Sequence, residues 1–266
     1  MSLTSLLRLA SATLAALGVA TALGTAGPAV TASDDSVLRP VAGTSGPEAV
    51  QRSRQVRQRQ AATAASSNSY AFGSTLDGKP LRFDPCTPIR WTANTGSGPA
   101  GGLTVLKTAV AEVARRTGTT WTYVGNTSTV PRASYLPGSA QESYPPVLIG
   151  WTDGSRSDLL AGQPSGTLAM ARNAWFGVQR PDGTRLAAVR TAVVALDRTD
   201  RLPLTGPVSW TAVALHELGH AVGLGHTEDR SQLMASVMPR TTGALQVGDR
   251  TGLTKLGREA GCVTVP

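Results

Sequence analysis

Apolar residues recur with two different periods along the chain from about residue 70 onward. Leu106, Val110 and Val113 recur at helical spacing and Gly118 follows them as a stop, which predicts a helix over residues 103–116. Shorter apolar runs have the pattern of strands. The strands that they predict are residues 88–92, 121–124, 147–151, 166–175 and 186–196.

A second helix is predicted over residues 207–222, because Pro207 is a favoured first-turn residue and the positions after it are apolar on nearly every side. A helix of this kind is expected to lie buried beneath a sheet. A last short helix is predicted over residues 249–256. By length the chain could form one large domain or two small ones, and these strands and helices are compatible with one α+β domain over residues 69–266.

The first 32 residues have the pattern of an export signal. Arg8 precedes an apolar run over residues 9–23, and small residues at 30–32 offer a cleavage site. A permanent transmembrane helix is the alternative, but the run is short and rich in Ala, Gly and Thr. No later segment is long and apolar enough to span a bilayer. We therefore expect a secreted, extracellular protein with no stable membrane span.

Residues 33–68 carry almost no large apolar side chains, so they cannot bury enough surface to offset the entropy of ordering. This segment is predicted to be a disordered linker or a pro-segment. The net charge of the whole chain is +8, and its densest arginine cluster lies here without interleaved aromatic residues. A solvated basic linker is favoured over attraction to an anionic cell envelope, and no nucleic-acid binding is expected.

Two cysteines, Cys86 and Cys262, lie near the two ends of the predicted domain. A disulfide between them would tie the first strand to the C-terminus and stabilise the fold by up to about 5 kcal/mol. Two free thiols are the alternative, which an oxidising extracellular environment disfavours.

The three histidines of the chain, His216, His220 and His226, all lie in the sequence HELGHAVGLGH. His216 and His220 are four residues apart and so share one helix face, from which both can bind one metal ion. Gly223 lets the backbone turn, so that His226 can return to supply a third nitrogen. Three protein ligands leave the fourth position of zinc open for water, as in catalytic zinc sites.

Glu217 follows the first of these histidines and is well placed to accept the proton of a zinc-bound water. The predicted site therefore has Glu217 as catalytic base and one zinc ion as cofactor. The competing interpretation is three buried histidines that are satisfied by hydrogen bonds. The extended motif fixes five positions, which makes the zinc interpretation much more specific.

The extended histidine motif resembles that of the metzincin zinc endopeptidases, and within them it is most similar to the matrixins. Thr227 stands where matrixins carry a small hydroxyl residue, and Met234 stands at the distance of their Met-turn, where it would support the ligands from below. Ser236 replaces the tyrosine ligand of astacins. The resemblance implies a twisted, mostly parallel sheet with one antiparallel edge strand, an active-site helix and a C-terminal helix.

Residues 147–151 and 166–171 are similar to the matrixin strand and substrate-binding edge strand. Met170 occupies the position of the histidine that holds a structural zinc in matrixins, so no second zinc is expected. Asp153 and Asp158 are candidates for calcium binding, although solvated loop carboxylates are the favoured interpretation.

The resemblance implies an endopeptidase whose protein or peptide substrate pairs with the edge strand, and we expect a monomer. The substrate-binding residues that it suggests are Leu168, Ala169, Ala171, Val237 and Pro239, with a plain loop as the alternative for the last two. Two other functions stay open: a zinc hydrolase of cell-wall or other non-protein amides, and a secreted binding protein with an inactive metal site. Intact Glu217 argues against the last of these.

Overall fold

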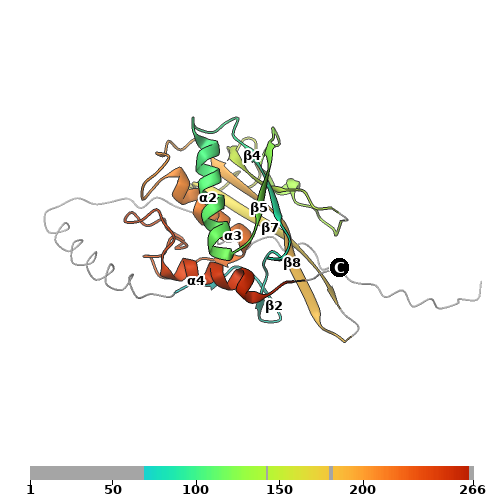
Figure 1. Cartoon of the computed structure of the whole chain (residues 1–266). Helices are drawn as coiled ribbons and strands as arrows, with labels where there is room; N and C mark the ends of the chain where they lie inside the picture. Colours follow the sequence, from blue (N-terminus) through green and yellow to red (C-terminus); the bar gives the residue numbers. More distant parts are fainter. Residues whose placement is uncertain (1–68, 142, 180–181, 264–266) are drawn as a thin grey trace, which may run out of the picture.

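The computed structural model describes residues 69–141, 143–179 and 182–263 (Figure 1). The predicted export signal and linker, residues 1–68, lie outside the described residues. Within the described ranges, no helix is long and apolar enough to cross a membrane.

Five strands form the main sheet in the order β5-β4-β6-β8-β7. Neighbouring strands are parallel except for β7, which is antiparallel to β8 and forms one edge. The prediction of a mixed sheet with one antiparallel edge strand is thereby confirmed. The strands are β4 (Ile89–Asn94), β5 (Trp121–Asn126), β6 (Val147–Thr152), β7 (Ala169–Gln179) and β8 (Arg185–Asp197).

Helices α2 (Gly102–Thr117) and α3 (Trp210–Val222) pack against each other on one face of this sheet (Figure 1). The main hydrophobic core lies between them and the sheet, and a smaller cluster around Leu159 and Met170 covers the other face. Gly118 ends α2 in a left-handed conformation with φ of 66°, as its position in the sequence predicted.

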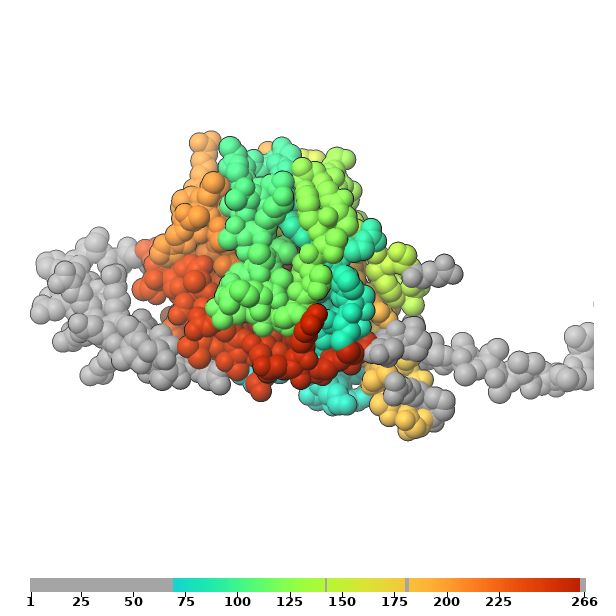
Figure 2. Space-filling model, viewed as in Figure 1, coloured from blue at the N-terminus to red at the C-terminus, as the bar shows by residue number. Residues whose placement is uncertain are grey.

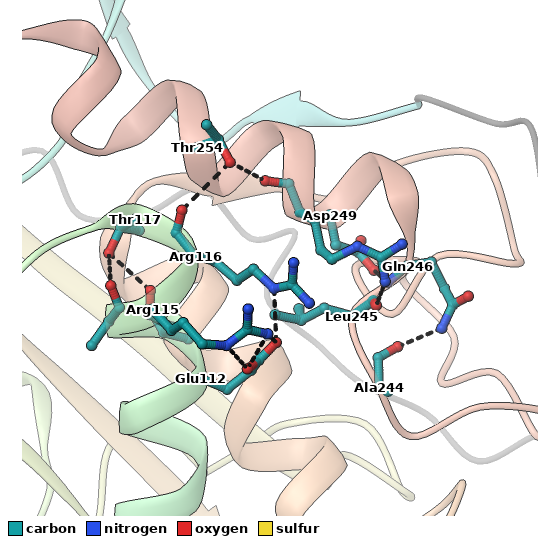
Figure 3. Close-up of polar contacts among 12 residues, drawn as sticks. Glu112, Arg115, Arg116, Thr117, Ala244, Leu245, Gln246, Asp249 and Thr254 are labelled. Atoms are coloured by element: carbon teal, nitrogen blue, oxygen red, sulfur yellow. Dashed lines mark hydrogen bonds and ion pairs between the residues drawn. The ribbon is translucent and has the colours of Figure 1, made fainter.

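Helix α4 (Val247–Leu256) crosses the C-terminal end of α2, with the short helix η2 (Arg258–Ala260) after it. Figure 3 shows this crossing, where the Thr254 hydroxyl donates to the Arg116 carbonyl at 3.4 Å. Figure 2 shows the same C-terminal segment running across the lower end of α2 on this face of the molecule. Another short helix, η1 (Ala133–Tyr135), precedes β6.

Several predicted boundaries were wrong, and those of α3 and β7 differ most. Helix α3 begins at Trp210 rather than at Pro207, because Ser209 is extended and its hydroxyl accepts the Ala212 N–H at 3.3 Å, which makes it the N-cap. Strand β7 begins at Ala169 rather than at Gly166, because residues 164–167 form a turn closed by a backbone hydrogen bond of 3.1 Å. The strand also continues to residue 179, where its pairing with β8 ends.

Short strands and a disulfide hold the two ends of the described domain in place. Strand β1 (Ala71–Phe72) pairs antiparallel with β9 (Leu224–Gly225), and β2 (Thr75–Leu76) forms a hairpin with β3 (Lys79–Pro80). Cys86 and Cys262 form a disulfide across a sequence separation of 176 residues, with their Cα atoms 5.5 Å apart.

Candidate metal centre

Helix α3 places His216 and His220 one turn apart on the same buried face. The helix ends at Gly223, whose φ of 120° favours glycine and whose N–H donates to the carbonyls of Gly219 and His220. A side chain at this position would also overlap the Leu81 carbonyl, since a Cβ would lie 2.4 Å from that oxygen. Both constraints explain why the turn that returns the chain toward the helix contains glycine.

The segment after this turn is held by residues from the start of the described domain. Strand β1 pairs with Leu224 and Gly225, and the Ser69 hydroxyl lies 2.6 Å from that of Thr227. These contacts bracket His226 on both sides. The position of His226 therefore depends on residues 69–72, which lie more than 150 residues away in sequence.

The Nε2 atoms of His216, His220 and His226, the histidine triad, lie 3.0, 3.1 and 3.2 Å from one another. Tetrahedral zinc with bonds of about 2 Å needs its ligand nitrogens about 3.3 Å apart, so the triad fits this ion closely.

The hydrogen bonds of the Nδ1 atoms show that the Nε2 atoms are the ones available to a metal ion. Nδ1 of His216 lies 2.7 Å from the Leu233 carbonyl, and Nδ1 of His220 lies 2.9 Å from the Leu224 carbonyl. A carbonyl can only accept, so both Nδ1 atoms carry the proton and both Nε2 atoms present a lone pair to the centre. Converging lone pairs repel one another, and a cation between them removes that repulsion.

Burial also favours the neutral, metal-binding form of the rings. It lowers the pKa of His216 well below its usual value, with the neighbouring triad rings adding to the effect, and it lowers the pKa of His226 to about 4. The interpretation as hydrogen-bonded core histidines fits poorly, because His216 and His220 have no Nε2 proton to share.

Glu217 is completely buried, and neither of its carboxylate oxygens has a hydrogen-bond partner among the described residues. Burial raises the pKa of this carboxyl well above its usual value. A buried carboxylate without a donor costs several kcal/mol, on the order of the desolvation of a polar group. An orphaned acceptor directly after the first histidine is therefore matched to a donor outside the protein, such as a water molecule on a bound metal ion.

Met234 is buried in the main core and packs against Gly219 of helix α3. A Cβ at residue 219 would lie 2.5 Å from the Met234 sulfur, so only glycine allows this approach. The Met234 carbonyl accepts the Thr227 N–H at 3.0 Å, which joins the methionine turn to the segment of the third histidine.

Two buried polar side chains, which the sequence analysis did not single out, join the methionine turn to helix α4. Asp249, in the first turn of α4, accepts the backbone N–H groups of Leu233 and Met234 at 2.8 and 3.1 Å. Gln232 in return accepts the N–H groups of Gly248 and Asp249 at 2.9 and 3.3 Å. The N-terminus of α4 and the methionine turn thus cap each other.

One peptide group connects Asp249 to the triad. The Met234 N–H donates to Asp249, and the carbonyl of the same peptide unit, that of Leu233, faces His216 Nδ1. Because the peptide is planar, the carboxylate that fixes the N–H also aims the carbonyl at the ring. In the sequence, the only signal for this role was an acid at the third position of a short helix that follows Gln246.

The predicted substrate-binding residues differ from the triad, because their side chains do not converge on one point. The side chains of Leu168, Ala169 and Ala171 are buried in the main core, so only their backbone is offered at the edge of β7, a strand that pairs only with β8 in the part of the chain that the structure describes. Val237 is half-buried and Pro239 is buried, and both follow the methionine turn.

The carboxylates considered for calcium are engaged elsewhere. Asp153 forms an ion pair with Arg198 at 2.5 Å, and Asp158 accepts the Ala133 N–H at 2.7 Å. Within the described residues neither belongs to a cluster that could hold a metal ion. Met170 packs into the smaller core cluster.

Residues 117–257, more than half of the chain, match the family model described as Matrixin. The match runs from the last turn of α2 through α4 and includes the triad, Glu217 and Met234. No curated protein matches the sequence.

Proposed function

Since this chain belongs to the matrixin family of zinc-dependent metalloendopeptidases, we propose that it is a secreted enzyme that hydrolyses internal peptide bonds, with the histidine triad as its zinc ligands and Glu217 as its general base. The observation that carries the proposal is the convergence of three imidazole nitrogens beside an unpartnered, buried carboxylate. A purely structural metal site has no need of that carboxylate.

A zinc ion held by the histidine triad would supply Lewis acidity, which would activate a water molecule and polarise the scissile carbonyl. No described residue forms a hydrogen bond with the Glu217 carboxylate, so it is available to take a proton from the attacking water and deliver it to the leaving nitrogen. The carbonyls of Leu233 and Leu224 keep His216 and His220 in the tautomer that binds metal.

The substrate lies extended along the free edge of β7 and pairs with the backbone around residues 168–171, as peptides do at exposed sheet edges. Val237 and Pro239 contribute to the wall that receives the side chain after the cleaved bond. In this arrangement the alanines of the edge strand serve through their backbone, and their small side chains let β7 lie close to the core.

Export is supported by the apolar run in residues 9–23 and by the disulfide between Cys86 and Cys262. The proposed organisation is a signal over residues 1–32, a linker or pro-segment over 33–68 and the catalytic domain over 69–266. N-terminal sequencing of protein from the culture medium tests this, because a chain that begins at or beyond residue 33 is expected. A full-length chain found only in the membrane fraction would contradict it.

The catalytic proposal is tested by metal analysis and cleavage assays on the protein and on Glu217→Ala, with Glu112→Ala, a carboxylate that forms surface ion pairs on α2, as the control. One zinc ion is expected in all three, and cleavage of casein only in the protein and the control. Mass spectrometry of the products should show cuts inside the chain. Equal cleavage by Glu217→Ala would overturn the role of Glu217, and digestion of cell-wall material with intact casein would overturn the substrate class.

A further inference from the structure

A pocket of about 780 Å³ opens where three segments of the chain meet away from the triad. These segments are the β2–β3 hairpin, the start of β8 and the C-terminal segment that follows α4. In Figures 1 and 2 they come together at the lower end of the molecule.

Positive charge dominates the lining of this pocket. Four cationic side chains face one carboxylate, that of Glu259, and only Arg185 has an ion-pair partner, Asp77, among the described residues. The other three cations are Lys79, Arg82 and Lys255.

Arg82 is the least ordinary of these cations because it is only 7% exposed. Its guanidinium donates to the carbonyls of Ala260 and Gly261 at 3.0 and 2.7 Å, and no carboxylate in the described part of the chain forms an ion pair with it. The nearby Asp84 is already engaged by the backbone and hydroxyl donors of its own turn and by the Val263 N–H. Asp84 acts on Arg82 through its charge, without a hydrogen bond between the two, so an anionic ligand in the pocket would stabilise this buried cation further.

The remaining walls are apolar, with Phe72, Leu76, Pro80 and Leu186 among them. A ligand that fills this space therefore needs apolar groups between its negative charges. The volume lies in the range of pockets that enclose several side chains or one small molecule.

The pocket is also joined to the catalytic centre. Phe72 lines it and pairs in β1 with Leu224, whose carbonyl faces His220 Nδ1. A segment bound here therefore lies against the strand pair that supports the metal-binding turn.

We propose that this pocket, the cationic pocket, binds an acidic and apolar segment of the protein substrate, at a distance from the bond that is cut. The proposal rests on the proposed function, since it takes the substrate to be a polypeptide. It predicts that protein substrates with alternating acidic and apolar residues outside the cleaved sequence are preferred, through a lower KM rather than a higher kcat.

The test compares one neutral fluorogenic peptide with the same peptide carrying an Asp/Leu tail, a Lys/Leu tail or a Ser/Leu tail on spacers of increasing length. The acidic tail is expected to lower KM about tenfold at low salt, with kcat unchanged, and added salt should reduce the gain. Lys79→Glu and Lys255→Glu should abolish it. Lys107→Glu, which makes the same charge change on the exposed face of α2, should retain it.

Fluorescence anisotropy of the labelled Asp/Leu tail alone gives a readout without cleavage. Saturable binding that Lys79→Glu and Lys255→Glu remove supports the pocket even if the peptide bond is not cut, which separates this proposal from the catalytic one. Equal KM values for all tails, or a gain that persists in both pocket variants as in Lys107→Glu, would overturn it. Equal binding of inorganic phosphate and the tail would also overturn it, because the site would then be a simple anion site.

Discussion

Replacing Asp249 by asparagine changes one oxygen into a donor at a point where three backbone N–H groups already face the side chain. Oδ2 accepts from Leu233 and Gln246 at 2.8 and 2.7 Å, and Oδ1 accepts from Met234 at 3.1 Å. An asparagine that keeps the first two bonds must place its NH₂ against the Met234 N–H. The substitution therefore acts on the very peptide group that faces His216.

The size of the effect follows from the bonds that are lost. A hydrogen bond to a charged acceptor contributes about 1.5–3 kcal/mol, and relief from burying a charge returns part of it, so Asp249→Asn is expected to cost about 2 kcal/mol of unfolding free energy. Asp249→Ala leaves all three N–H groups without an acceptor and is expected to cost about 4 kcal/mol. Misaligning a group that orients a metal ligand lowers metal affinity by about 10–100-fold.

The pH dependence has a definite sign. Burial outweighs the three donors and raises the pKa of Asp249 above 3.8, so the folded protein holds this proton to higher pH than the unfolded chain. The part of the stability that is linked to this proton is fully present below 3.8 and is lost as pH rises through the folded pKa, while the three backbone hydrogen bonds remain. Relative to Asp249→Asn, the metal-free protein should therefore lose stability across that window.

Urea unfolding gives the free energy, and competition with a chelator gives the zinc affinity. Asp158→Asn is the matched control, because the same change is made at an exposed carboxylate that accepts one backbone N–H. The reasoning fails if Asp249→Asn leaves both quantities within the range of this control.

Three further outcomes are expected. Gly219→Ala should lower Tm and zinc affinity, at a cost of about 1–3 kcal/mol from overlap with the methionine sulfur, while Gly138→Ala, with open space around it, should change neither. The pKa of Asp153 is lowered to about 2, first by its hydrogen bond from Ser155 and then by its ion pair with Arg198. The stability that this carboxylate contributes should therefore be lost as pH falls from 3.8 to about 2, and Asp153→Asn should show no such loss in acid unfolding curves. Reduction of the disulfide should lower the unfolding free energy by up to about 5 kcal/mol, measured in urea with and without reductant.

The elements with a strong local signal could be predicted from the sequence. The period of Leu106, Val110 and Val113 predicted α2, with Gly118 as its stop, and both ends lie within a residue of the prediction. Helix α3 was placed correctly except for its first turn, where the hydroxyl of Ser209 determines the start and Pro207 does not. The histidine spacing predicted a site that the structure assembles, because helix periodicity alone brings two of its three ligands together.

What the sequence did not indicate depends on contacts between distant residues. Gln232 and Asp249 are 17 residues apart, and each is an unremarked polar residue until the chain folds and buries both. The distal half of β7 is similar: residues 176–179 become a strand because β8 pairs with them, and their own pattern does not demand it.

These distant contacts determine which part of the chain the metal centre needs. The third histidine is held by Ser69 and β1 from one end of the domain, and the methionine turn is held by Asp249 from the other. The family match begins only at residue 117, so β1 lies outside it although it supports a triad residue. The disulfide then joins Cys86, which follows β1, to Cys262, which follows α4, and restrains both supports at once. Loosening either end should therefore lower zinc affinity before it unfolds the sheet, because both supports form hydrogen bonds to the segments that carry the ligands and neither is a strand of the five-stranded sheet.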